Sequence, residues 1–556
     1  VLSFTTVPAL ASLLLSANTK DKEPRLMIVF RKYYLPLLDL AIKYRQKTMI
    51  AGGVAVILGV VLFMTRGSEF LPQLSEGSFA FHMIRPVNVS LTQSIEFQEK
   101  ADVLVKEFPE VKDVFSRIGT SEVATDPMGV NVADSYIMLK PRSEWPKSGW
   151  SAKTYEELVQ AIVAKLEKQL PGQSYLASQP IQMRFNELLE GTRADVAVKI
   201  YGPDLKTLMN LGQEVQEIVK GVKGAGDVET DMAGTSPVYR ISPKSDLLSS
   251  YGASLYDVLE TISVALGGEE AGYIYSAERK YPLIVRLNDK DRGDIQTIES
   301  LPVGLAGNAT TPLSNLAKMS FQETYGSVNR ENSSRRSTVM INLRGRDTES
   351  FVTEAQKKVA DTIKMPSGYF IEWGGNFKNL QQAKQRLFIL TPIALAIILA
   401  MIYAAFGSLP QTFLIFSCVP LALVGGIVSL MLRGLPFSIS AGIGFIALSG
   451  IAVLNGVVLV NYFNQLRTTE GLTGIELVKK ATTIRLRPVL MTALVAIFGF
   501  IPMMISTGVG SEVQRPLATV VIGGILSSTL LTLVVLPVLY LVFEKHMQKF
   551  SQKFSH

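Results

Sequence analysis

The chain has 556 residues, of which 47% are hydrophobic and only 19% are charged. Soluble domains usually carry about 25% charged residues, so this composition indicates membrane-spanning segments. A single cysteine and three histidines argue against a disulfide framework, a cysteine-based metal site and a zinc enzyme with clustered histidines, and the net charge of +7 comes without the basic and aromatic pattern of nucleic-acid binding.

The first segment, residues 1–16, is apolar but shorter than the ~20 residues that a membrane-spanning helix needs. It lacks the basic stretch that begins a signal peptide. We interpret it as the tail of a transmembrane helix, cut by the start of the chain, so that the chain is the C-terminal part of a longer protein. Residues 17–47 are then expected to form a linker helix.

Six further apolar segments meet the length criterion for crossing a membrane. They are residues 48–65, 387–406, 411–432, 436–463, 489–507 and 516–543. Gly425, Gly426 and Ser429 in the third segment are typical of close helix packing. The sequence therefore predicts one span at 48–65 and five spans within 387–543.

The basic residues give these spans an orientation. Residues 18–47 carry eight Lys and Arg against three Asp and Glu, which places them in the cytoplasm by the positive-inside rule. The basic loop 464–488 and the basic tail 544–556 fall on the same side. Residues 66–386 then form one large external region.

The external region alternates strands and helices in a repeating pattern. Four strand–helix units are expected at residues 79–119, 135–180, 196–222 and 337–375. An insert at about 226–325 separates the third from the fourth. The repeat favours split-βαβ, ferredoxin-like subdomains. The predicted fold class is thus an α+β membrane protein, a transmembrane α-helical bundle plus a large external α/β region.

One span, one large external loop and five more spans resemble the second half of a resistance-nodulation-division (RND) transporter. The sequence stretches that carry the resemblance are EFLPQLSEGSFAFH (69–82), GTSEVATDPMGVNVADSYIMLKPRSEW (119–145), QMRFNELLEGTRADVAVKIYG (182–202), GGEEAGYIYSAERKYPLIVRL (267–287), VNRENSSRRSTVMINLRGRD (328–347) and GIAVLNGVVLVN (450–461). They are similar to the heavy-metal efflux branch, of the cobalt–zinc–cadmium type.

This resemblance implies an inner-membrane transporter of a Gram-negative bacterium that exports Zn, Co, Cd or Ni in exchange for protons. It implies a homotrimer in lipid, a periplasmic adaptor protein and an outer-membrane channel as partners, and no cofactor. Residues 66–386 would lie in the periplasm as the porter and docking region, with the docking subdomain at about 226–325. A Walker-type ATPase is not expected, because the sequence has no phosphate-binding GxxxxGK[ST] loop, and another enzyme is not expected, because no nucleophile–base pair or closed metal-ligand set appears.

The stretch QMRFNELLEG supplies the first metal-binding candidates, Glu187 and Glu190, which lie three residues apart on one helical face. In the copper and silver members that the chain resembles, a methionine occupies the position of Glu187. Carboxylate oxygen suits harder divalent ions and thioether sulfur suits Cu(I) or Ag(I), so Glu187 favours a divalent cargo. Resemblance and sequence proximity add the acidic candidates Asp195, Asp231, Glu269 and Glu270. For each carboxylate alone, a solvated surface position remains the alternative.

Three softer side chains have a structural alternative as well. His82, the only histidine before the C-terminal tail, is either a metal ligand or a packed strand residue. Met183 and Met232 could add sulfur ligands, although isolated methionines usually belong to a core.

Polar residues in the membrane segments are the candidates for proton transfer. By resemblance, Asn455, Arg485 and Thr492 support a proton relay. Drug-exporting relatives have a lysine where this chain has Leu454, and their acidic relay residues lie in the first half of the protein. A helix–helix hydrogen bond, of about 0.6 kcal/mol, is the alternative role of Asn455.

Three other functions stay open. The same fold could export copper or silver, or hydrophobic drugs through an external pocket rich in Phe and Met. A membrane secretion or interaction factor without transport would need no polar residues in its spans, and Asn455 and Asn461 argue against it.

Overall fold

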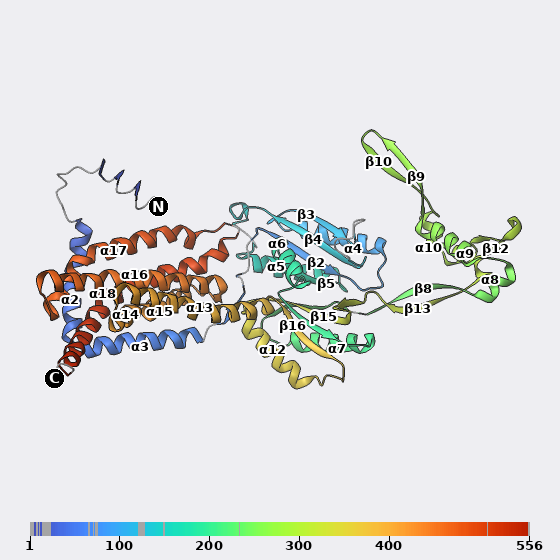
Figure 1. Cartoon of the computed structure of the whole chain (residues 1–556). Coiled ribbons are helices and arrows are strands. Elements are labelled where there is room, and N and C mark those ends of the chain that lie inside the picture. The colour runs from blue at the N-terminus through green and yellow to red at the C-terminus, as the bar shows by residue number, and fades with distance from the viewer. Residues whose placement is uncertain are drawn as a thin grey trace.

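The computed structural model describes residues 5–6, 9–10, 12–13, 24–64, 67–70, 72, 76–120, 128–147, 151–232, 234–508 and 510–553. The molecule is elongated, with a helical bundle at one end, two helix-covered sheets in the middle and a small domain at the far end of a two-stranded arm (Figure 1). The helix tail predicted for residues 1–16 lies mostly outside the described residues. Residues 17–47 contain helix α2 (Arg25–Lys43), as expected for the linker.

Within the part of the chain that the structure describes, six helical segments are long and apolar enough to cross a membrane. They are α3 (Arg45–Met64), α13 (Asn376–Phe406), the consecutive α14 (Leu409–Phe416) and α15 (Cys418–Leu432) counted together, α16 (Ile439–Glu470), α17 (Gly474–Ile505) and α18 (Ser511–Lys553). Each apolar segment predicted from the sequence overlaps one of them. The chain is a membrane protein with several apolar spans.

Helices α15 and α18 approach each other through small residues, as the sequence predicted. A Cβ atom on Gly425 would lie 2.1 Å from Ser527 Oγ and 2.3 Å from the Gly523 carbonyl oxygen. Ser429 Oγ also donates a hydrogen bond of 2.8 Å to the Thr519 carbonyl across the same contact. Small side chains let two backbones pack this closely, which is how helices associate in lipid.

The first sheet of the extramembrane region is antiparallel, with the strand order β3-β4-β2-β5. Its elements follow the chain as β2 (Ser78–Ile84), α4 (Leu91–Lys106), β3 (Val111–Ile118), β4 (Val132–Leu139), α5 (Tyr155–Gln169) and β5 (Ser174–Ser178). Both helices begin at hydroxyl caps: Ser90 accepts from the Gln93 amide and Thr154 from the Glu157 amide.

The second sheet repeats the same chain order. Its elements are β6 (Val196–Tyr201), α7 (Leu205–Lys220), β7 (Ala225–Thr230), β14 (Asn329–Glu331), β15 (Ser334–Leu343), α12 (Thr348–Thr362) and β16 (Phe370–Gly375). The strand order is β14-β15-β6-β16, and β7 also pairs with β15. The insert expected at about 226–325 therefore begins later than the sequence indicated, because β7 belongs to this sheet.

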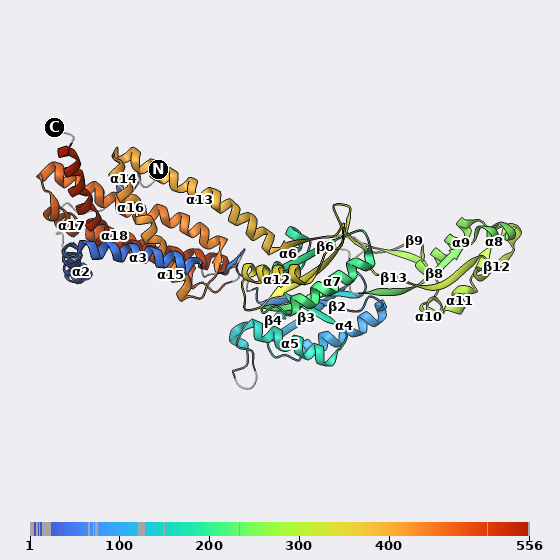
Figure 2. The same ribbon diagram turned by 90° about the horizontal axis from the view of Figure 1, so that it is seen from below.

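The insert leaves the second sheet on a long ribbon of two antiparallel strands, β8 (Thr235–Pro243) and β13 (Ala317–Tyr325). The small domain that the ribbon carries contains α8 (Ser245–Tyr251), α9 (Leu255–Ile262), α10 (Asp289–Gly293), α11 (Ile295–Glu299), β11 (Pro302–Gly304) and β12 (Thr310–Pro312). The hairpin of β9 (Glu269–Ser276) and β10 (Arg279–Val285) stands away from it in both views (Figures 1 and 2).

A two-residue parallel pair connects the bundle to the extramembrane region. Strand β1 (Ser68–Glu69), which follows α3, pairs with β17 (Phe437–Ser438), which leads directly into α16. A Cβ atom on Gly67 would lie 2.0 Å from the carboxylate carbon of Asp347, the residue that caps the N-terminus of α12. Only a glycine fits here without displacing the Asp347 side chain.

Candidate metal-handling site

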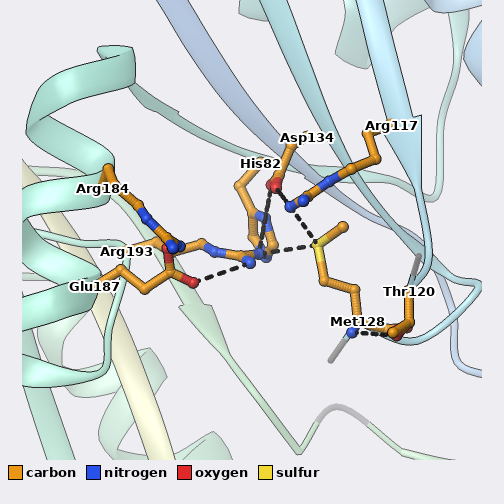
Figure 3. A network of polar contacts seen from close by, with 8 residues as sticks. All are labelled: His82, Arg117, Thr120, Met128, Asp134, Arg184, Glu187 and Arg193. Carbon is orange, nitrogen blue, oxygen red and sulfur yellow. Dashed lines mark hydrogen bonds and ion pairs between the residues drawn. The ribbon is translucent and has the colours of Figure 1, made fainter. Parts of the chain in front are cut away.

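Three polar side chains form one row across the first sheet. The antiparallel register pairs His82 of β2 with Asp134 of β4, and Asp134 with Arg117 of β3, so all three side chains leave the same face of the sheet. His82 Nδ1 lies 2.8 Å from Asp134 Oδ1, and Arg117 donates to Asp134 Oδ2 over 2.7 Å (Figure 3). The His82 and Asp134 side chains are both buried.

The charge of Asp134 is set by these neighbours. Burial alone would raise its pKa, but the His82 hydrogen bond, the positive charge of Arg193 and the Arg117 hydrogen bond outweigh burial and lower the pKa to about 2. The row therefore holds a fully ionised carboxylate inside the protein at neutral pH.

Helix α6 (Pro180–Glu190) carries the QMRFNELLEG stretch beside this row. Its first turn is attached to the segment before β2, because the Glu76 carboxylate accepts hydrogen bonds from the Ile181 and Gln182 amides at 2.7 and 2.8 Å. The helix ends at Gly191, whose left-handed φ of 64° suits glycine.

Arg193 follows this turn and reaches back to the row. Its Nη1 atom lies 2.9 Å from His82 Nδ1 and 3.4 Å from Asp134 Oδ1. The same atom lies 3.2 Å from Met128 Sδ, while Nη2 lies 3.3 Å from Glu187 Oε1. A neutral imidazole can thus bond the carboxylate as a donor or the guanidinium as an acceptor, according to its tautomer.

Glu187 is held between two arginines and is not simply a solvated surface carboxylate. Its Oε2 atom accepts from Arg184 over 2.6 Å, and its Oε1 atom faces Arg193 (Figure 3). The Glu187 side chain is 21% exposed, against 54% for Arg184 and 11% for Arg193. Glu187 therefore joins α6 to the His82 row through a shared guanidinium.

Sequence reasoning did not single out four other charged residues of this network: Arg117, Asp134, Arg184 and Arg193. Asp134 is the charged residue of the otherwise uncharged strand β4, which is a signal for a buried ion pair, whereas Arg117 shares β3 with the charged Lys112 and Asp113 and carries no such signal. Arg184 lies three residues before Glu187 on the same helix, a spacing at which opposite charges meet. Arg193 lies beyond the helix end and carries no comparable local signal.

The other acidic candidates lie elsewhere. Asp195 accepts from the Leu343 amide at 3.3 Å, and burial raises its pKa to about 6, with a further contribution from Asp227. Asp231 accepts from the Thr338 amide at 2.7 Å and from Asn329 at 2.8 Å. Both aspartates are thus bonded to the backbone or side chains of the second sheet.

Glu269 and Glu270 are exposed on β9, in the hairpin far from α6 (Figure 1). The side chain of Glu190 lies outside the described residues. Within the described part of the chain, no three His, Cys, Asp or Glu side chains are close enough together to hold a metal ion as they stand. The candidate carboxylates therefore do not form the single cluster that their sequence proximity suggested.

The methionine and histidine candidates differ in their surroundings. Met183 and Met232 are each 4% exposed, and Met232 packs in the core of the second sheet, as the structural alternative predicted. His82 is buried and packed, yet it also contacts Arg193 within the Glu187 network. Its position thus leaves a role in metal handling open as a proposal.

The membrane candidates for the proton relay have separate neighbours. Asn455 is buried in α16, and the Arg485 guanidinium of α17 lies over the Tyr462 ring of α16 at 4.2 Å. Thr492 Oγ1 donates to carbonyls of its own helix, including that of Pro488 at 3.1 Å. Among the residues that the structure describes, no hydrogen bond joins Asn455, Arg485 and Thr492, so the relay stays a prediction.

Known proteins with similar sequences and a similar structure share this architecture. The chain is 42% identical over 546 residues to the cobalt-zinc-cadmium resistance protein CzcA of Cupriavidus metallidurans, a match that covers 97% of this chain and 51% of that protein. It is 41% identical over 544 residues to the nickel and cobalt resistance protein CnrA of the same organism, covering 97% and 50%. The cation efflux system protein CusA of Escherichia coli K12 is 28% identical over 525 residues, covering 93% and 50%.

A crystal structure of a heavy metal efflux pump superposes with a TM-score of 0.85 at 32% identity, covering 98% of this chain and 54% of that one. The chain thus spans about half the length of the curated relatives it matches. The profile of the AcrB/AcrD/AcrF family matches residues 1–544. The resemblance to RND transporters is therefore confirmed, and the chain belongs to the AcrB/AcrD/AcrF family of RND membrane transporters.

Proposed function

We propose that the whole protein is an inner-membrane pump of a Gram-negative bacterium that exports divalent heavy-metal cations in exchange for protons. Three relatives that match at 41–42% identity are named for resistance to cobalt, zinc, cadmium or nickel. The cation efflux protein CusA matches at only 28%. The comparison therefore favours divalent metals as cargo.

The observation that carries the proposal is the donor set around Glu187. Carboxylates of Glu187 and Asp134, the imidazole of His82 and the thioether of Met128 all contact one guanidinium. Oxygen and nitrogen ligands suit Zn, Co and Ni, whereas Cu(I) and Ag(I) sites are built mainly from sulfur. A single thioether among oxygen and nitrogen donors points to the divalent ions.

The remaining assignments are proposals of the same kind. The two sheets would be ferredoxin-like subdomains in the periplasm. Apart from the short β14, each has the chain order strand–helix–strand–strand–helix–strand, and the pairing order β3-β4-β2-β5 of the first sheet corresponds to β7-β15-β6-β16 in the second. The protein would act as a homotrimer with an adaptor protein and an outer-membrane channel, and the insert on the β8–β13 ribbon would serve docking. Asn455, Arg485 and Thr492 would support proton transfer with acidic residues of the other half.

The test is metal tolerance of a metal-sensitive host that produces the full-length protein. We expect tolerance to Zn, Co, Cd or Ni, and its loss in Glu187→Gln, which keeps the size of the side chain but removes its charge. Glu217→Gln is the matched control, because Glu217 is 77% exposed and is paired with Lys220 one helical turn away. Protein levels in the membrane are compared by immunoblot.

Three results would contradict the proposal. Protection against dyes or detergents instead of metals would indicate a drug exporter. Protection against copper or silver alone would indicate a monovalent cargo. Divalent-metal tolerance that survives Glu187→Gln would separate the transport function from this site.

A further inference from the structure

The guanidinium of Arg193 sits among four potential metal ligands. Its two terminal nitrogens lie 2.9–3.4 Å from a nitrogen of His82, a sulfur of Met128 and one carboxylate oxygen each of Asp134 and Glu187. These atoms come from separate elements: β2, the segment before β4, β4 and α6. Arg193 is the group on which they converge (Figure 3).

The positive charges around the two carboxylates differ in burial. Asp134 and Glu187 face three arginines, with exposed side-chain fractions of 42% for Arg117, 54% for Arg184 and 11% for Arg193. Charges at exposed positions are screened by water and salt, whereas a buried charge is screened much less. Arg193 is therefore the cation that neutralises the interior of the site.

A metal ion and this guanidinium cannot use the same donors together. Zinc binds nitrogen and oxygen ligands at about 2.0–2.2 Å, so donors that now surround a guanidinium at hydrogen-bond distance would have to move inward. As long as Arg193 stays, an incoming dication also meets its positive charge at close range. Both effects oppose metal binding in the arrangement seen here.

The chain connects Arg193 and two of its partners, His82 and Asp134, to different sheets, while helix α6 with Glu187 contacts strands of both. His82 and Asp134 belong to the first sheet, and α6 is attached to the segment before β2 through Glu76. Arg193 follows the turn at Gly191 and lies three residues before β6 of the second sheet. A change in the angle between the two sheets would therefore move Arg193 relative to His82 and Asp134, the two partners that the first sheet holds.

We propose that Arg193 is a built-in competitor of the transported cation: its guanidinium occupies the His82–Met128–Asp134–Glu187 site, a divalent ion binds when Arg193 withdraws, and the return of Arg193 expels the ion. This inference rests on the proposed function and names the ligands and the release device of that site. Arg193 is thus a positioning residue that sets affinity and release, and it is not itself a metal ligand.

The test is equilibrium binding of Co²⁺ and Zn²⁺ to purified full-length protein, measured by calorimetry, together with tolerance in the host. Arg193→Gln removes the competing charge, so we expect about tenfold tighter binding and reduced tolerance, because the ion is no longer expelled. Arg193→Lys keeps a positive charge but loses the two-pronged guanidinium, so its affinity for the metal should lie between those of wild type and Arg193→Gln. Arg184→Gln removes a charge from the same Glu187 at an exposed position and should change the affinity less than about twofold.

If Arg193→Gln does not fold, Arg193→Lys still tests the inference. Lysine cannot contact several donors at once as a guanidinium does, so this variant should still bind the metal ion more tightly than wild type. Unchanged or weaker binding in the folded Arg193 variants would overturn the inference. So would an Arg184→Gln effect equal to that of Arg193→Gln. A wild-type protein that confers tolerance while the Arg193 variants bind no tighter would refute only the role of Arg193, whereas absence of both binding and tolerance in wild type would refute the proposed function.

Discussion

Asp134 in the first sheet and Asp195 at the start of the second both lie in the interior of the extramembrane region, but their pKa values move in opposite directions. For Asp134, His82, Arg193 and Arg117 outweigh burial, and its pKa falls to about 2. For Asp195, burial dominates the hydrogen bond from the Leu343 amide, and its pKa rises to about 6. Burial alone therefore does not decide the charge of a carboxylate in this protein.

The difference lies in the cations supplied to each side chain. The first sheet places an imidazole and two guanidinium groups around Asp134, so the charge is stabilised where it is buried. Around Asp195 the neighbouring charge is another carboxylate, Asp227. The site proposed for the cation thus contains its own positive charges, and the structure offers three ways to test this contrast.

The largest effect is expected for Asp134→Ala. It leaves Arg193 beside His82 without its buried counter-charge, and breaking a buried ion pair costs about 3–5 kcal/mol of unfolding free energy. The folded-state pKa of Asp134 is depressed, so this stabilisation is present above pH ~4 and is lost as the pH falls toward 2. Thermal unfolding of the purified full-length protein at pH 7, followed by tryptophan fluorescence, measures the loss.

Asp113→Ala is the control for this prediction. Asp113 lies on the neighbouring strand β3 and pairs with Lys106, but its side chain is 64% exposed, so its removal should lower the unfolding free energy far less than Asp134→Ala does. Equal losses in the two variants would mean that the cations around Asp134 do not stabilise the fold.

A smaller effect of the opposite sign is expected for Asp195→Asn. Because the folded-state pKa of Asp195 is raised to about 6, the native protein binds more protons than the unfolded chain between pH ~4 and ~6, and wild-type stability falls as the pH rises through this window. The asparagine resembles the protonated acid and should gain about 1–2 kcal/mol at pH 7.5. At pH 4.5 the two proteins should unfold at nearly the same temperature, and a gain that does not depend on pH would contradict this origin.

The smallest effect is expected for Arg184→Gln. Arg184 pairs with Glu187 over 2.6 Å, closer than the 3.3 Å between Arg193 and Glu187, yet the Arg184 side chain is 54% exposed. Exposed pairs of this kind contribute about 0.3–0.5 kcal/mol. A stability loss comparable to that of Asp134→Ala, in the same thermal assay, would show that distance and not burial determines the strength of these pairs.

Most of the architecture could be predicted from the sequence because its signals are local. Apolar runs marked the six spans, and alternating or helical periodicity marked the strands and helices of both sheets. Strand β7 was placed in the insert because nothing in its own sequence reveals that it pairs with β15, more than a hundred residues away.

The site could be predicted only in part for the same reason. Glu187 was found through a local stretch, but its connection to His82 depends on strand register and on Arg193, which approaches from the other sheet. Glu269 and Glu270 looked close to Glu187 along the chain, and the β8–β13 ribbon carries them far away. Sequence distance is a poor guide wherever an insert leaves its parent sheet on such a ribbon.

The two-residue pairing of β1 with β17 joins the segment that follows α3 to the segment that leads into α16. Beside it, Gly67 fits against the Asp347 carboxylate at the start of α12, while β17 continues into α16, the helix that carries Asn455. A rotation of α12 would therefore reach Gly67 through Asp347 and, through the β1–β17 pair, the first turn of α16.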